Sequence, residues 1–131
     1  MVPTTALDQY MEAVLWTRTP AALSHETALD LYELCDVNPA RIHITVPATY
    51  RLRRNAPAVY ELHRRDLDEA DSTLHEGIPI VTIRRAILDC IEANIGGHLI
   101  GQALEEVRKK GLIGERDVAL VSDTYQARQS T

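Results

Sequence analysis

Apolar side chains follow helical spacing near both ends of the chain and strand alternation in its middle. Positions three or four residues apart share one face of a helix, and they predict helices over residues 6–16, 24–35, 83–93, 99–110 and 115–125. β-Branched and alternating apolar residues suit a half-buried strand, and they predict strands near 41–46, 58–63, 72–75 and 78–81. We therefore expect an α+β fold: a small mixed or antiparallel sheet of about four strands, packed with four to five helices.

Local signals predict where several of these elements begin and end. Ser24 and Thr82 suit the N-cap position, because a hydroxyl there accepts a hydrogen bond from a free backbone N–H group of the first turn. Gly96 or Gly97 suits the left-handed residue that ends the third helix. Pro79 lies inside the last strand, so that strand is predicted to be an edge or to pair only beyond the proline.

The pattern is that of a single domain over residues 1–131, with a flexible polar tail at 126–131. The hydrophobic fraction of 45% and the charged fraction of 25% are ordinary for a soluble globular protein. No apolar run reaches membrane-spanning length and no signal peptide begins the chain, so we expect a cytoplasmic protein. Cys35 and Cys90 each lie on an apolar helix face and are expected to be buried free thiols.

Arginine is concentrated in the middle of a chain whose net charge is −5. Residues 41–85 hold eight arginines and six acidic residues, a balance of +2. The candidate binding residues are five arginines that follow the two central strands: Arg51, Arg53, Arg54, Arg64 and Arg65. Arginine binds carboxylates and phosphates through paired hydrogen bonds, so an exposed cluster would suit an acidic protein patch or a phosphate. The alternative is a solvated turn, in which the acidic residues at 66–71 neutralise Arg64 and Arg65.

The histidines do not predict a metal site. His25-Glu26 begins the letters of a zinc-protease helix, but position 29 is Leu where the second histidine has to be. The five histidines are scattered, at positions 25, 43, 63, 75 and 98. His43 and His63 meet if their strands pair, although strand histidines are more often surface residues than ligands.

Other catalytic patterns are incomplete as well. Ser24 and His25 are neighbours in sequence, which does not orient a hydroxyl toward an imidazole as a nucleophile needs. Asp89 and Glu92 lie on the polar face of the third predicted helix without a third carboxylate. Neither a phosphate-binding loop nor a dinucleotide-binding fingerprint occurs in the sequence. We therefore predict a protein that catalyses nothing and needs no cofactor.

Three blocks of sequence, in this order, carry a resemblance to a known family. They are LSHETALDLYEL followed by DVNPARIHITVP, then LHRRDL at 62–67, then EGIPIVTIRRAILDCIEA at 76–93. This region, roughly residues 20–110, resembles the domain that follows the winged helix–turn–helix in AbiE-type antitoxins of type IV toxin–antitoxin systems and in their transcriptional-regulator relatives. The chain departs from the family pattern at Ile83, where the family usually has proline.

The resemblance implies a non-catalytic domain that binds a protein partner and neutralises a nucleotidyltransferase-like toxin. The family's DNA-binding winged helix needs roughly 60 residues, and we expect it to be absent because only about twenty residues precede the matched helix. The alternative is a nucleic-acid-binding or transcription-regulatory module that uses the arginine-rich middle segment. Salt separates the two, because a phosphate-driven complex weakens steeply with salt and an apolar protein interface does not.

Overall fold

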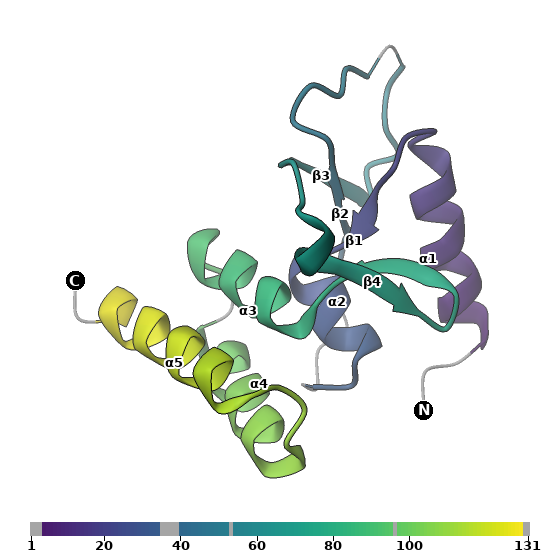
Figure 1. The fold of residues 1–131 in the computed structure, drawn as a ribbon. Helices are drawn as coiled ribbons and strands as arrows, with labels where there is room; N and C mark the ends of the chain where they lie inside the picture. Colours follow the sequence, from purple (N-terminus) through teal and green to yellow (C-terminus); the bar gives the residue numbers. More distant parts are fainter. Residues whose placement is uncertain (1–3, 35–39, 53, 96, 130–131) are drawn as a thin grey trace.

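The computed structural model describes residues 4–34, 40–52, 54–95 and 97–129, and it confirms the predicted α+β class (Figure 1). Its helices are α1 (Thr4–Trp16), α2 (His25–Leu31), α3 (Ile83–Glu92), α4 (Gly97–Lys110) and α5 (Glu115–Gln129), with a short 3₁₀ turn η1 (Glu69–Asp71). Its strands are β1 (Ala22–Leu23), β2 (Ile42–Val46), β3 (Tyr60–Arg64), β4 (Ser72–His75) and β5 (Ile78–Val81). All four predicted strands are present, and β1 is an addition.

The five strands form one mixed sheet in the order β3-β2-β1-β5-β4. β2 and β3 run parallel, with Ile42 opposite Tyr60. β1 joins the two halves of the sheet, because it pairs antiparallel with β2 and parallel with β5, where Leu23 is opposite Ile80. A strand of two residues is too short for its alternation to be recognised in the sequence.

β4 and β5 form the predicted hairpin around Glu76 and Gly77. Both turn residues have positive φ, 53° and 77°, as the type I′ turn of a two-residue hairpin loop requires. β4 is the edge of the sheet, so the prediction of β5 as an edge strand is wrong. The alternative, pairing only beyond the proline, holds against β1, where pairing is at Ile80. It does not hold against β4, which also pairs with Ile78 and Pro79.

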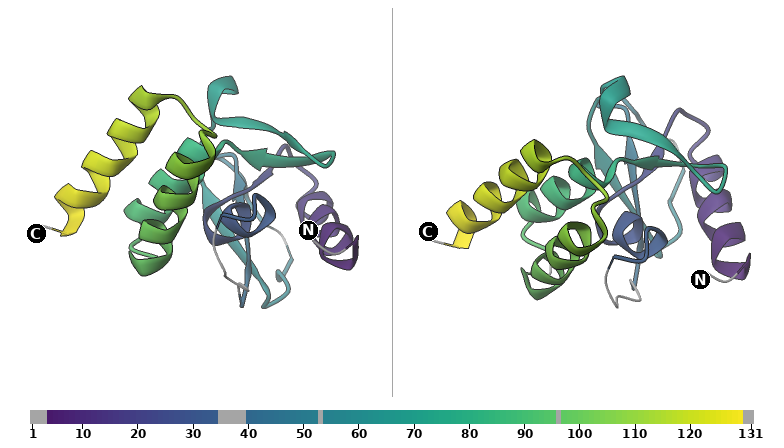
Figure 2. Two further views of the ribbon diagram at one scale, coloured as in Figure 1. Left: turned by 90° about the horizontal axis from the view of Figure 1, so that it is seen from below. Right: turned by 60° about the horizontal axis from the view of Figure 1, so that its bottom comes forward.

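Helices cover both faces of the sheet (Figure 2). α1 packs on β1, β2 and β5, and Trp16 at its end contacts Tyr60 edge-on with ring centroids 5.5 Å apart. α2 packs on the opposite face, where its first residue, His25, stacks against His43 of β2. α3 packs on α2, and α4 and α5 pack on α3, so the three helices extend away from the sheet as a separate layer.

The core is aliphatic and runs from the sheet into this helical layer. Its largest fully buried side chains are Leu23, Leu29, Leu31, Leu34, Ile44, Val46, Ile78, Ile80, Val81, Ile87, Val107 and Val121. Burial of a Leu, Ile or Val side chain contributes about 1.5–3 kcal/mol, so this set supplies the main stabilisation of the fold.

α3 begins as predicted but ends differently. The Thr82 hydroxyl accepts a hydrogen bond from the N–H of Arg85 at 3.3 Å, which confirms the N-cap. The helix is closed by Asn94 (φ 55°) rather than by Gly96 or Gly97, since asparagine also tolerates the left-handed conformation. Gly97 instead begins α4, and Gly96 lies outside the described residues.

α2 is shorter than predicted. It ends at Leu31, because Glu33 adopts φ of 58° and the N–H of Leu34 closes the turn on the carbonyl of Leu29 at 3.0 Å. The predicted thiol Cys35 lies outside the described residues, whereas Cys90 is buried.

α5 is longer than predicted and runs to Gln129. The expected flexible tail at 126–131 is therefore helical over 126–129, and residues 130–131 lie outside the described part of the chain. No described helix is long and apolar enough to span a bilayer.

Candidate functional site

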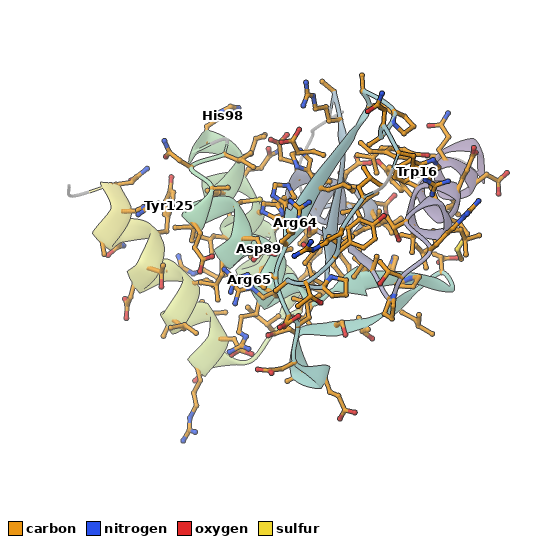
Figure 3. All side chains as sticks on the ribbon, turned by 90° about the horizontal axis from the view of Figure 1, so that it is seen from above. Trp16, Arg64, Arg65, Asp89, His98 and Tyr125 are labelled. Carbon is orange, nitrogen blue, oxygen red and sulfur yellow. The ribbon has the colours of Figure 1, made fainter. Side chains whose placement is uncertain are left out.

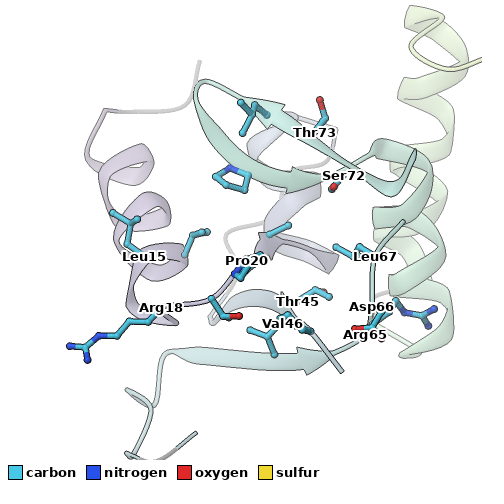
Figure 4. A pocket seen from close by; sticks show the side chains of 17 residues that line it. Leu15, Arg18, Pro20, Thr45, Val46, Arg65, Asp66, Leu67, Ser72 and Thr73 are labelled. Carbon is cyan, nitrogen blue, oxygen red and sulfur yellow. The ribbon is translucent and has the colours of Figure 1, made fainter. Parts of the chain in front are cut away.

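An open cavity of about 1060 Å³ lies where β2 and β3 end (Figure 4). Its walls come from the end of α1 and the loop after it, from β1, from the end of β2, from residues 65–67 and from the β4–β5 hairpin. The lining is mainly apolar, and Thr45, Ser72 and Thr73 are among its polar side chains. Because parallel strands bring their carboxyl ends to one edge of a sheet, this edge is a common position for a binding site. We call it the sheet-end cavity.

The two most exposed large apolar side chains of the described residues line the sheet-end cavity. Leu15 of α1 and Leu74 of β4 are each 67% exposed. The apolar spacing within residues 6–16 is compatible with burial of both Val14 and Leu15, but only Val14 is buried, together with Tyr10 and Ala13. The cavity therefore has apolar contact points on two separate elements.

Arginines flank the cavity on two sides. Arg18 and Arg65 both belong to its lining, and their side chains point away from its centre in opposite directions (Figure 4). Arg18 is exposed and has an unusual positive φ of 56°. The Arg65 guanidinium turns toward α3, where it forms an ion pair with Glu92.

The structure gives the candidate arginines different surroundings. Arg51 is exposed and makes no hydrogen bond or ion pair within the part of the chain that the structure describes. Arg54 packs over Trp16, and Arg64 donates from Nε to the carbonyl of Tyr50 at 3.1 Å. Arg53 lies outside the described residues.

Parallel pairing of β2 and β3 explains this arrangement. The loop after β2 and the end of β3 meet at the same edge, so Arg64 reaches Tyr50. Two of the acidic residues proposed to neutralise Arg64 and Arg65 have other partners. Asp66 accepts from the N–H of Ala48 at 2.9 Å, and Asp71 pairs with Arg84 at 3.1 Å.

A second candidate site consists of three histidines where the start of α2 packs on the sheet. His25 begins α2, His43 lies in β2 and His63 lies in β3. His43 Nδ1 is 3.0 Å from His63 Nε2, and the rings of His25 and His63 stack with centroids 3.8 Å apart. One nitrogen from each ring lies within 4.8 Å of those of the other two. We call these residues the histidine cluster.

Register and helix placement create the histidine cluster. His43 is opposite Glu61 and Thr45 is opposite His63, so both histidines project from the face that α2 covers. The prediction that His43 and His63 meet if their strands pair is therefore confirmed. No pattern in the sequence indicated that His25 would join them, because it comes from a separate element.

Burial keeps the histidine cluster neutral. Desolvation, reinforced by nearby positive charge, lowers the pKa of His25 to about 3 and the pKa of His43 to about 4. Burial also lowers the pKa of His63, partly offset by the carboxylate of Glu61. At pH 7 the three rings therefore carry no charge, and each retains one unprotonated nitrogen.

Ser24 orients His25. The expectation that these neighbours would not face each other is wrong: the Ser24 hydroxyl and His25 Nδ1 are hydrogen-bonded at 2.7 Å. The predicted N-cap bond of Ser24 is consequently missing. His25 has φ of 55°, a left-handed conformation that costs a non-glycine residue roughly 1–2 kcal/mol. Because Ser24 is fully buried, it does not reach a substrate as a nucleophile would.

A charged network borders the same region. Asp89 is 2% exposed, although the sequence pattern placed it on the polar face of α3. Its Oδ1 accepts from Arg85 Nε at 2.9 Å, and Oδ2 has no hydrogen-bond partner among the described residues. Arg85 and Arg65 both pair with Glu92, and Figure 3 shows Arg65 and Asp89 on this side of the sheet. Burial raises the pKa of Asp89 to about 6 despite these arginines.

Comparison with known proteins identifies no relative, since neither a protein-family model nor a curated protein matches the chain. The likeness to AbiE-type antitoxins rests on the three sequence blocks alone.

Proposed function

We propose that this chain is a non-catalytic, cytoplasmic, antitoxin-like domain that binds a protein partner, a nucleotidyltransferase-like toxin. The proposal combines the sequence resemblance with one structural observation. The sheet-end cavity has the two most exposed leucines of the described chain in its lining.

Apolar residues beside a concave surface are typical of a protein-binding site. Exposed apolar patches on soluble proteins mark interaction surfaces, and the residues that dominate binding energy fill pockets in the partner or receive its side chains. Leu15 and Leu74 come from different elements, yet both line one cavity. A partner segment that inserts an apolar side chain would contact both leucines and exclude water from them.

Charge favours an acidic partner segment. Arg18 belongs to the rim of the cavity, where its exposed side chain points outward, and Arg51 is exposed in the loop after β2. The net charge of −5 opposes a nucleic-acid partner. Arg54, Arg64 and Arg65 donate to groups of their own chain, which leaves fewer arginines for a phosphate backbone.

The test is a binding titration between the purified chain and the toxin, by calorimetry. Leu15→Asp and Leu74→Asp each place a charge in the contact, and we expect each to weaken binding about tenfold or more. Leu120→Asp on α5 is the matched control, because Leu120 is also exposed, at 43%, and does not line the cavity. If Leu15→Asp and Leu74→Asp bind the toxin as tightly as Leu120→Asp does, the interface lies elsewhere on the chain.

The arginines are tested by salt dependence. We expect Arg18→Ala together with Arg51→Ala to slow association and to reduce its dependence on salt, with a smaller effect on dissociation. The same chain is titrated with duplex and single-stranded oligonucleotides. Tight oligonucleotide binding with a steep salt slope would support the nucleic-acid alternative instead.

A further inference from the structure

We propose that His25, His43 and His63 form a zinc-binding site that ties α2 to the parallel pair of β2 and β3. This site is independent of the sheet-end cavity and of the proposed toxin partner. None of the three residues forms a recognisable metal motif in the sequence, because each comes from a different element.

The donor set suits zinc. Imidazole nitrogen is a preferred ligand of Zn²⁺, and three protein ligands leave a fourth tetrahedral position for water or another group. Two nitrogens bound to one tetrahedral zinc at about 2.0–2.1 Å lie about 3.3 Å apart. His43 Nδ1 and His63 Nε2 are 3.0 Å apart and share a hydrogen bond, and one nitrogen from each of the three rings lies within 4.8 Å of the other two. Zinc would replace the proton in that hydrogen bond, which moves to another ring nitrogen or to solvent.

A hydrogen bond that orients the His25 ring is already present. Ser24 Oγ lies 2.7 Å from Nδ1 of His25. In the tautomer whose Nδ1–H donates to this oxygen, the lone pair of Nε2 is available to a metal. Hydrogen bonds of this kind fix the orientation of zinc-bound histidines and raise metal affinity. The unfavourable backbone conformation of His25 is consistent with a functional constraint on that side chain.

Metal binding requires the rings to turn. The three rings are now nearly parallel, with interplanar angles of 18°, 18° and 27°, whereas lone pairs that share one ion have to converge on it. Rotation of a histidine ring about χ2 is soft. His43 and His63 are only partly buried, so fewer packed neighbours oppose the rotation of their rings than in the core.

Neighbouring charges moderate the affinity. The guanidiniums of Arg65 and Arg85 act on His25, and that of Arg41 acts on His43. They oppose a dication, and the carboxylate of Glu61 beside His43 and His63 favours it. We therefore expect weaker zinc binding than at a site built from thiolates.

The experiment titrates the chelator-treated full chain with zinc chloride by calorimetry and follows its thermal unfolding. We expect one ion per chain and an increase in Tm with added zinc. We expect His43→Gln, His63→Gln and His25→Asn each to weaken binding about tenfold or more. Asparagine is chosen at position 25 because it tolerates the positive φ of that residue.

His98→Gln is the matched control, because His98 is exposed on α4 and outside the cluster. Circular dichroism establishes that each variant is folded. The proposal is overturned if the wild-type chain does not bind zinc, or if the cluster variants bind zinc as tightly as His98→Gln does. In either case the three histidines are a stack of neutral rings with no metal-binding role.

Cobalt provides a readout that does not depend on the variants. Substitution of Co²⁺ into a four-coordinate imidazole site gives strong visible absorption, whereas six-coordinate surface binding gives weak absorption. We expect strong bands that zinc displaces. Weak bands in the wild-type chain would overturn the proposal even where a variant fails to fold.

Discussion

The guanidinium carbon of Arg54 lies 4.1 Å from the ring centroid of Trp16, and the same guanidinium donates a hydrogen bond to the Trp16 carbonyl. These two contacts connect the loop after β2 to the end of α1. A cation over an indole ring at an exposed site contributes about 0.5–1 kcal/mol. Arg54 thus has a structural role, whatever partner the chain binds.

We expect Arg54→Ala to lower the free energy of unfolding by about 1 kcal/mol, measured by urea denaturation. Arg51→Ala is the control, because Arg51 lies in the same loop and is exposed; its effect should stay within about 0.5 kcal/mol. Equal stability of the two variants would show that the stacking contributes nothing.

The sequence predicted those elements whose pattern is long enough to repeat. β4 and β5 have their predicted bounds, since alternation and the Glu76-Gly77 turn act together. β1 was missed because two residues cannot alternate. The parallel pairing of β2 and β3 was also beyond the pattern, because the connection between residues 46 and 60 permits either direction.

The candidate sites depend on contacts between residues far apart in the chain. Arg54, Arg64 and Arg65 were identified by composition, but their partners lie 38, 14 and 27 residues away. A search for metal ligands by helical spacing cannot find a cluster that two strands and a helix share. The exposure of Leu15 could not be predicted for a similar reason. The apolar spacing of α1 is compatible with two overlapping helix faces, and only packing against the sheet determines which face is buried.

Tyr10 connects α1 to α2 through its hydroxyl, which donates to Asp30 Oδ2 at 2.5 Å. Tyr10 is 7% exposed, so water cannot replace this bond freely. We expect Tyr10→Phe to lower the free energy of unfolding by about 1–2 kcal/mol. Tyr125→Phe is the comparison, since the Tyr125 hydroxyl donates to the carbonyl of Gly97 at an exposed site. A larger loss at Tyr125 than at Tyr10 would contradict the argument.

Gly77 is required by the hairpin turn. Its φ is 77°, and a Cβ added there would meet no atom within 4 Å, so any cost of Gly77→Ala comes from the backbone alone. We expect a loss of roughly 1–2 kcal/mol in thermal or chemical unfolding. Gly97→Ala, also in open space but without positive φ and at the first residue of α4, should be neutral or stabilising. The same sign for both substitutions would refute this account.

Asp89 should make stability depend on pH in an unusual direction. Burial raises the pKa of Asp89 to about 6 in the folded chain, although Arg85 and Arg65 oppose the shift and Glu92 adds to it. The unfolded pKa is near 3.9. Between these values the folded state holds a proton that the unfolded state has released, so this carboxyl stabilises the fold below about pH 4 and loses that contribution as pH rises through about 6.

Asp89→Asn isolates this effect, because the amide resembles the protonated carboxyl and does not titrate. We expect the unfolding free energy of the variant to rise relative to wild type as pH increases from about 4 to about 7, by up to about 3 kcal/mol. Urea denaturation at four or five pH values measures the difference, in which titration of the histidines cancels. Asp117→Asn serves as the control, because Asp117 is only partly buried, lies on α5 and forms no ion pair with Arg65 or Arg85. A difference between Asp89→Asn and wild type that is constant across this range would mean that the buried carboxyl keeps its ordinary pKa, with Arg85 and Arg65 compensating its burial in full.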